Sequence, residues 1–245
     1  MLEIGGGRTV FEPAAGRGRL SVPAQAGRRY ADAQLDDYHG LARRRFPDRP
    51  PLQLSLRARA SHAAPAGTLG FGFWNDPFSL SGGVLAAPNT AWFFYASPPS
   101  DMALVDGVPG WGWKAATLNA GRVPAALLAP AALAAGALTL IPGLGAPVLA
   151  AARRSVQARE APLADIGLTE WHTYELRWEG AAAVFRVDGV ERLRSEVAPA
   201  GPLGLVLWID NQYAVASRTG RFGFGVCPVP DAQWLEFEAL TLTVC

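Results

Sequence analysis

Two stretches of the sequence place an Asp/Asn pair directly behind a run that contains tryptophan. The first reads FWND at 73–76, and the second reads LWIDNQY at 207–213. An aromatic ring covers the C–H face of a sugar, while Asp and Asn exchange hydrogen bonds with its hydroxyls. These stretches therefore predict a site for a carbohydrate or a small polar ligand. Its candidate contacts are Trp74, Asn75, Asp76, Trp208, Asp210, Asn211 and Tyr213.

The same residues also have structural explanations. Asp and Asn commonly end strands because their side chains bond nearby backbone, and Pro77 after Asp76 fits a turn. No Gly or Pro stands beside Asp210 and Asn211, so a turn explains the second pair less fully. Large aromatic side chains dominate protein cores, and each candidate ring has this alternative.

The acidic residues could also serve in catalysis or in ion binding. Asp76 and Asp210 are the alternative catalytic pair, since an inverting glycosidase holds its carboxyl groups about 6.5–9.5 Å apart. We expect no cofactor and no metal; calcium is the exception left open, although an EF-hand type loop is missing. Asp32, Asp36 and Asp37 could hold an ion, but they fit a solvated edge strand better.

Several other kinds of site are excluded. The sequence has no G-x-S-x-G nucleophile elbow and no glycine-rich phosphate loop that opens a helix. Cys227 and Cys245 have no further Cys or His at zinc-ligand spacing, so two free thiols are expected.

Composition and charge narrow the class of protein. The 245 residues are 50% hydrophobic and 18% charged, enough to build one large folded domain over 1–245. A net charge of +1, with arginines spread along the chain, predicts no nucleic-acid partner. The first residues show no secretory signal, so a cytoplasmic location is expected.

Most of the chain alternates apolar and polar residues with the period of a β-strand. Many short strands without alternating helices favour an all-β sandwich or jelly roll. The expected strands are Leu52–Ser61, Thr68–Trp74, Ala91–Ser97, His172–Trp178, Ala183–Val187, Leu203–Ile209, Arg221–Val226 and Trp234–Val244.

The segment 123–160 departs from this pattern. It is rich in Ala and Leu and uncharged from Val123 to Ala152, which predicts a helical insertion in two pieces that end at Ile141 and Glu160. Four prolines argue against one membrane-spanning helix. We expect packing on the sandwich, with a lid over an apolar ligand or a peripheral membrane contact as alternatives.

The motifs WHTYELRW at 171–178 and FRVDG at 185–189 resemble the concanavalin A-like lectin/glucanase jelly rolls, especially glycoside hydrolase family sixteen. The resemblance spans roughly residues 52–244 and implies a concanavalin A-like jelly-roll β-sandwich. It also implies that the strand at 91–97 lines the concave face, which adds Trp92 and Tyr95 to the candidate ligand contacts.

The same strand departs from the hydrolase pattern. The family carries its catalytic carboxylates at alternate positions there, but AWFFYAS at 91–97 has no acid, so the family's catalytic residues do not carry over. Glu236 and Glu238 alternate on the closing strand and are expected to be structural and solvent-facing. We therefore expect non-catalytic recognition of a glycan or related polar ligand, with a hydrolase using Asp76 and Asp210 as the alternative.

Overall fold

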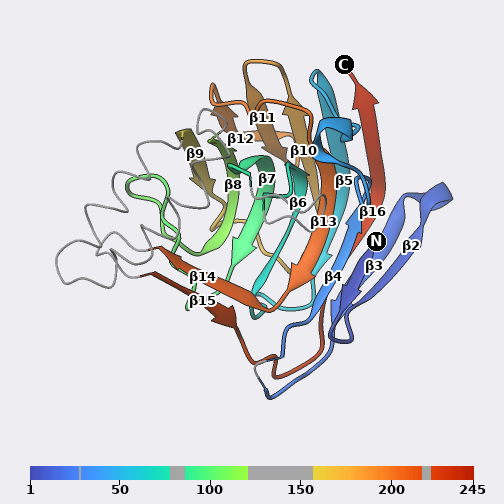
Figure 1. Ribbon diagram of the computed structural model, residues 1–245, viewed down its shortest axis with the longest axis vertical. Helices are drawn as coiled ribbons and strands as arrows, with labels where there is room; N and C mark the ends of the chain where they lie inside the picture. Colours follow the sequence, from blue (N-terminus) through green and yellow to red (C-terminus); the bar gives the residue numbers. More distant parts are fainter. Residues whose placement is uncertain (28, 78–85, 121–156, 217–221) are drawn as a thin grey trace.

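Two seven-stranded antiparallel sheets form most of the protein that the structure describes (Figure 1). The computed structural model describes residues 1–27, 29–77, 86–120, 157–216 and 222–245. Sheet A contains, in spatial order, β1 (Leu2–Ile4), β4 (Asp32–Asp36), β13 (Gly204–Asp210), β6 (Thr68–Trp74), β7 (Asn89–Ala96), β8 (Gly112–Asn119) and β9 (Gln157–Pro162). Sheet B contains β12 (Val190–Ser195), β11 (Ala183–Val187), β10 (His172–Trp178), β5 (Leu52–Ala60), β16 (Gln233–Val244), β3 (Arg17–Val22) and β2 (Arg8–Glu12).

Three smaller elements complete the described chain. A two-stranded ribbon of β14 (Gln212–Ala216) and β15 (Phe222–Val226) continues from the end of β13. Two single-turn 3₁₀ helices, η1 (Pro13–Ala15) and η2 (Arg43–Arg45), are the helical elements among the described residues. The architecture is therefore an all-β sandwich, as the strand periodicity predicts.

Alternation along the strands places one apolar face of each sheet in a shared core. Along β5, for example, Leu52, Leu54 and Leu56 are buried, and the residues between them are partly exposed. Phe71 and Phe93 from sheet A meet Tyr174 from sheet B edge to face, with ring centroids 5.1 and 5.0 Å apart. The interior thus takes every second residue of a strand and leaves the others to the outer faces.

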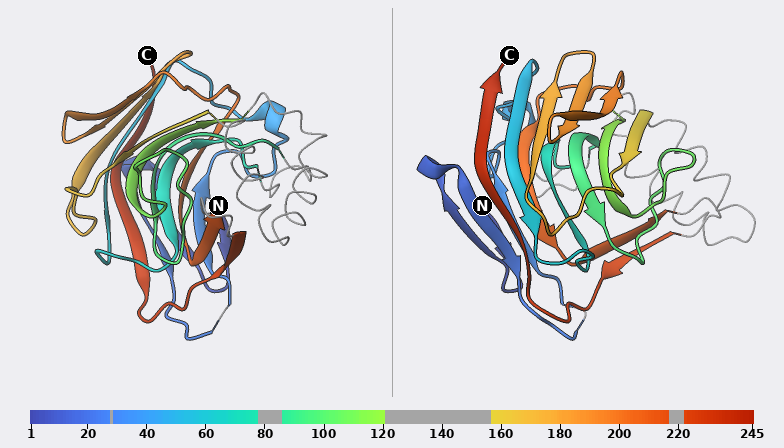
Figure 2. Two further views of the ribbon diagram at one scale, coloured as in Figure 1. Left: turned by 90° about the vertical axis from the view of Figure 1, so that its left-hand side faces the viewer. Right: turned by 180° about the vertical axis from the view of Figure 1, so that it is seen from behind.

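Both sheets bend in the same direction, and sheet A lies on the inside of the bend (Figure 2, left). Its outer face therefore lies on the hollow side of the molecule, while the outer face of sheet B lies on the rounded side. A ligand that enters the concave side would therefore meet the outer face of sheet A.

The expected helical insertion at 123–160 lies almost entirely outside the described residues. Where the structure describes it, the expectation is wrong: residues 157–160 begin β9, which pairs with β8 from Lys114↔Pro162 to Asn119↔Gln157. Pairing with a buried strand outweighs the helical composition of this segment. No helix in the described part of the chain is long and apolar enough to cross a membrane.

Candidate functional site

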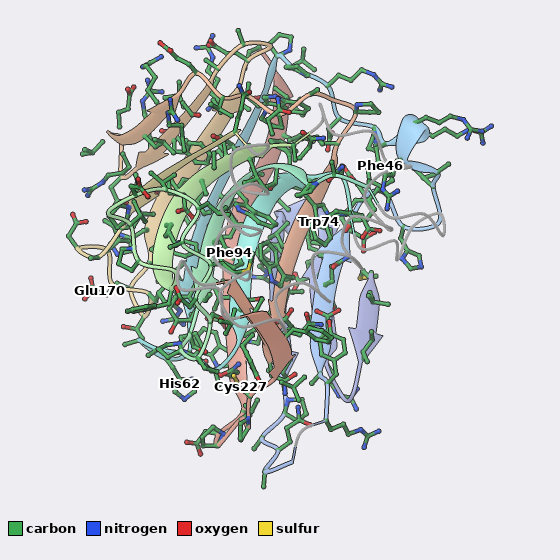
Figure 3. All side chains as sticks on the ribbon, turned by 60° about the vertical axis from the view of Figure 1, so that its left-hand side comes forward. Phe46, His62, Trp74, Phe94, Glu170 and Cys227 are labelled. Atoms are coloured by element: carbon green, nitrogen blue, oxygen red, sulfur yellow. The ribbon has the colours of Figure 1, made fainter. Side chains whose placement is uncertain are left out.

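A second cluster of aromatic side chains lies on the outer face of sheet A, separate from the core between the sheets. We call this surface the aromatic face. Trp208 and Tyr38 are buried in it, and Trp74, Trp92 and Phe94 pack against them while keeping part of their surface open. Figure 3 looks toward this side of sheet A, with Trp74 and Phe94 labelled near its centre.

The rings of the aromatic face lie close to one another and in several cases nearly parallel. Trp74 and Trp208 are inclined by 5° at a centroid distance of 6.5 Å, and Trp92 and Phe94 by 18° at 5.2 Å. Trp92 and Trp208 lie 5.2 Å apart and join the two pairs. Contiguous, partly open rings of this kind can receive the C–H face of a sugar.

Two glycines on β6 make room for these indoles. A Cβ atom at Gly70 would lie 2.6 Å from Cη2 of Trp208, and one at Gly72 would lie 2.7 Å from Cβ of Trp92. Gly72 also has a φ of 152°, in the region where glycine is favoured. The TLGFGFW sequence of β6 therefore places large residues in the core and leaves open backbone beneath the aromatic face.

Hydrogen bonds hold two of the indoles in place. Nε1 of Trp74 donates to the Tyr38 hydroxyl at 2.5 Å, and Nε1 of Trp208 donates to Oγ1 of Thr68 at 2.9 Å. Oγ1 of Thr68 in turn donates to Oδ1 of Asp210 at 2.9 Å. The position of Trp208 is thus coupled to a carboxyl group at the edge of the aromatic face.

Asp210 lies directly opposite Asp32 in the β13–β4 register. We call these two residues the acid pair. Residues that oppose each other in adjacent antiparallel strands have Cβ atoms about 4.5–5.5 Å apart, so the two carboxyl groups are neighbours. Both residues are more than nine-tenths buried, at 3% exposure for Asp32 and 8% for Asp210.

The two members of the acid pair differ in their hydrogen bonds. Oδ1 of Asp210 accepts from the backbone N–H groups of Thr68 and Gln212, at 3.2 and 2.9 Å, as well as from the Thr68 hydroxyl. In the described part of the chain, no donor reaches the carboxyl group of Asp32, and no cationic side chain forms an ion pair with either member. The acid pair is therefore buried without a counter-charge.

Burial and like charge shift the titration of both carboxyl groups. Burial, together with the charges of Asp210 and Asp36, raises the pKa of Asp32 to about 8. Burial raises the pKa of Asp210 to about 6, although its hydrogen bonds from Gln212 and Thr68 act in the opposite direction. At neutral pH the acid pair thus holds one proton, mainly on Asp32, and one negative charge.

A buried ion pair borders the other side of the aromatic face. Lys114, the only lysine in the chain, is the cross-strand partner of Phe94. Its Nζ donates to Oε1 of Glu160 at 3.0 Å and to the carbonyl oxygen of Pro109 at 2.8 Å. Oε2 of Glu160 is buried without a hydrogen bond in the described structure.

Of the nine candidate ligand contacts, Trp74, Trp92, Trp208 and Asp210 lie on the outer face of sheet A. The side chains of Asn75 and Asn211 instead form hydrogen bonds with backbone groups. The Asn75 amide bonds Ala87 and Asn89, and Asn211 bonds the backbone at Arg29, Ala31 and Cys227.

Asp76 and Tyr95 are both buried and not open to a ligand. Asp76 is fully buried in the turn after β6 with a φ of 43°, and its carbonyl oxygen accepts from Arg43 at 2.6 Å. Tyr95 belongs to the core between the sheets at 5% exposure, so its prediction as a ligand contact is wrong. Trp92 and residue 95 are an odd number of positions apart and must face opposite sides of the strand. Phe94 takes the place predicted for Tyr95.

Tyr213 lies on the β14–β15 ribbon rather than on sheet A. A Cβ atom at Gly225, its cross-strand partner, would lie 2.8 Å from the Tyr213 hydroxyl, so this ring packs across β15.

The structure also separates the alternative catalytic pair. In the β6–β13 register, Asp210 opposes Thr68 while Trp74 opposes Gly204. Asp76 lies beyond Trp74, so about six strand residues, or roughly 20 Å, separate it from Asp210. The prediction that Asp76 and Asp210 form a catalytic pair is therefore wrong, because an inverting mechanism needs its two carboxyl groups less than half that distance apart.

Asp32 was expected on a solvated edge strand, and this expectation is also wrong. β4 lies between β1 and β13, and Asp32 and Gln34 are buried. Asp36 bonds to the backbone N–H of His39 at 2.8 Å and to Nε2 of Gln34 at 3.2 Å, so it holds local structure. The alternation in DAQLD at 32–36 could have indicated a buried strand, because it places the two acids and Gln34 on one face and Ala33 and Leu35 on the other.

Other expectations concern metals, thiols and the closing strand. Among the described residues, no group of three or more His, Cys, Asp or Glu side chains could hold a metal ion. Cys227 and Cys245 are free thiols. Glu236 pairs with Arg19 and Arg59, and Glu238 pairs with Arg57, on the outer face of sheet B, in agreement with their expected structural role.

No protein-family model and no curated protein sequence matches this chain. Among solved structures, it is similar to a GlcNAcα1-4Gal-releasing endo-β-galactosidase from Clostridium perfringens, with a TM-score of 0.46, 12% identity, and coverage of 94% of this chain and 53% of that chain. This chain thus spans about half the length of that enzyme.

Two further similar structures are a β-glucanase from Bacillus licheniformis and a legume lectin-like domain from Entamoeba histolytica. The β-glucanase gives a TM-score of 0.41 and 13% identity over 94% of this chain and 81% of that chain. The lectin-like domain gives a TM-score of 0.49 and 9% identity over 98% of this chain and 88% of that chain. These neighbours have concanavalin A-like lectin and glucanase folds, as the sequence motifs predict. Similarities this distant concern the fold alone.

Proposed function

We propose that the protein recognises a glycan on the aromatic face. The observation that carries this proposal is the set of partly open rings Trp74, Trp92 and Phe94 on the outside of sheet A, away from the core between the sheets. Aromatic side chains buried for stability alone would fill that core. Here they form a layer on the hollow side of the sheet, beside fixed carboxyl groups.

Polar groups next to the rings suit a hydroxyl-rich ligand. Gln34, opposite Trp208 in the register, donates from Nε2 to the Tyr38 hydroxyl at 3.1 Å, which fixes its amide. Asp210 and Glu160 each have an oxygen that makes no hydrogen bond among the described residues, on opposite sides of the rings. A sugar on the rings would therefore lie beside a hydrogen-bond acceptor of Asp210, with the buried carboxylate of Glu160 at the other side.

A glycan array probed with the purified protein and with Trp92→Ala tests this proposal. We expect specific binding to a subset of glycans and a loss of about tenfold or more in Trp92→Ala, since stacking on the most central ring is removed. Trp234→Ala on the outer face of sheet B is the matched control and should bind normally. Equal binding by both variants would place the site elsewhere.

Hydrolysis of the bound glycan is a second candidate, and the acid pair is the observation that favours it. Two adjacent carboxyl groups whose pKa values are separated can supply a proton donor and a charged partner. Release of reducing ends from a bound oligosaccharide, abolished in both Asp32→Asn and Asp210→Asn, would support hydrolysis. Binding without product formation would leave recognition alone.

A further inference from the structure

Asp32, unlike Asp210, has no structural task that the fold makes evident. Asp32 is only 3% exposed, yet its carboxyl group receives no hydrogen bond in the described part of the chain. Asp210 faces it across the register. Buried carboxyl groups normally receive hydrogen bonds or a counter-charge, because burial of an unpaired charge is costly. Asp32 lacks both and Asp210 lacks a counter-charge, so the acid pair is suited to a partner that arrives from outside.

The vacant acceptors of the acid pair match one kind of group. Three donors already occupy Oδ1 of Asp210, which leaves its Oδ2 and both oxygens of Asp32. Once Asp32 releases its proton to the solvent, three acceptor oxygens on two adjacent side chains suit the three N–H donors of a primary ammonium group. A calcium ion needs six to eight oxygen ligands, and no metal-binding group is found among the described residues.

Aromatic rings flank these carboxyl groups, as an ammonium site requires. Trp208 lies two residues from Asp210 on the same face of β13, which corresponds to about 7 Å along the strand. The Tyr30 hydroxyl is close enough to both acids that their charges, after burial, raise its pKa. Rings beside carboxylates attract cations through their π faces and exclude water from the contact.

We propose that the acid pair binds the ammonium group of an amino sugar within a glycan that lies on the aromatic face. This inference rests on the proposed function, because the rings position the saccharide whose amino group reaches Asp32 and Asp210. It names the ligand class: glycans with free amino groups are bound more tightly than neutral ones. Glycans rich in carboxylates are repelled, since Glu160 already neutralises Lys114 on the other side of the rings.

Three oligosaccharides of equal length and linkage test the inference by calorimetry. Hexamers of β-1,4-linked glucosamine, N-acetylglucosamine and glucose differ only in an ammonium, an acetamido or a hydroxyl group at C2. Near pH 7, where Asp210 is mostly ionised and part of the glucosamine amines are protonated, we expect the glucosamine hexamer to bind roughly tenfold tighter than the glucose hexamer. Asp32→Asn keeps the shape but replaces one acceptor oxygen with an N–H donor and cannot ionise, so it should remove this preference.

Asp36→Asn is the matched control. Asp36 lies on the same face of the same strand, but it bonds to His39 and Gln34 and takes no part in the acid pair. This variant should keep most of the preference for the glucosamine hexamer. An equal loss in Asp32→Asn and Asp36→Asn would indicate general charge attraction and overturn the inference.

The remaining outcomes separate the inference from the proposed function. If the glucosamine and glucose hexamers bind with equal affinity and both are lost in Trp92→Ala, the inference fails and glycan recognition stands. If the glucosamine preference survives in Asp32→Asn, the inference also fails. If no glycan on a broad array and none of the three hexamers binds, both proposals fail.

Discussion

The indole of Trp208 occupies the space that a side chain at Gly70 would need. A Cβ atom there would come within 2.6 Å of Cη2 of the ring and 2.3 Å of the Phe93 carbonyl oxygen. The aromatic face therefore depends on the absence of a side chain on the neighbouring strand, as well as on the rings themselves.

Gly70→Ala should destabilise the protein by about 1–3 kcal/mol, because the added methyl group overlaps backbone and displaces Trp208. Urea unfolding followed by circular dichroism measures this change. Gly223→Ala on β15 is the control: an added Cβ atom there meets nothing within 4 Å, and its effect should stay within about 0.5 kcal/mol. Equal stability of the two variants would show that Trp208 does not lie against β6 as described.

Asp32→Asn should stabilise the protein, and the gain should grow with pH. The pKa of Asp32 is raised from an ordinary value of 3.8 to about 8 in the folded state, so the folded state binds the proton more tightly. Stability is therefore lost as pH rises from about 4 to 8, and a neutral amide avoids this loss. The gain should be near zero at pH 4 and reach the order of a few kcal/mol at pH 8.

Thermal unfolding of the Asp32→Asn variant and the parent protein between pH 4 and pH 8 checks this dependence. Asp165→Asn, in an exposed pair with Arg192, serves as a control whose effect should be small throughout. A gain that is constant with pH would contradict the shifted titration of Asp32.

The buried ion pair of Lys114 and Glu160 should show strong coupling. Lys114→Met leaves a buried carboxylate without its partner and should cost about 3–5 kcal/mol, whereas Lys114→Met combined with Glu160→Leu should recover much of that loss. A double-mutant cycle by denaturant unfolding measures the coupling. Additive effects of the two substitutions would mean that the ion pair is not formed.

Strands with one polar and one apolar face could be predicted closely from the sequence. The expected ranges at 172–178 and 52–61 coincide with β10 and, to within one residue, with β5, in which buried and partly exposed residues alternate. The range at 68–74 also coincides with β6, where glycine and large apolar residues alternate although both faces are buried. β8 was missed because Trp113 to Thr117 are all buried, on both faces, so the alternation that identifies a strand is absent.

The candidate site was only partly predictable. Trp92 was placed on the ligand-binding face through family resemblance, and the same reasoning added Tyr95 although period two excludes their sharing a face. Asp32 could not be identified because its significance depends on Asp210, 178 positions later in the chain. Only the register of β4 with β13 brings the two carboxyl groups together.

The most direct test of glycan recognition is a ¹⁵N NMR titration of the tryptophan indole N–H signals with a glycan that the array identifies, each signal assigned by a Trp→Phe variant. The account predicts that the signals of Trp92 and Trp74 shift in proportion to occupancy, because they lie on the aromatic face. The signal of Trp178, fully buried between the sheets, should stay unchanged. Shifts confined to Trp171 and Trp234, on the outer face of sheet B, would contradict the account.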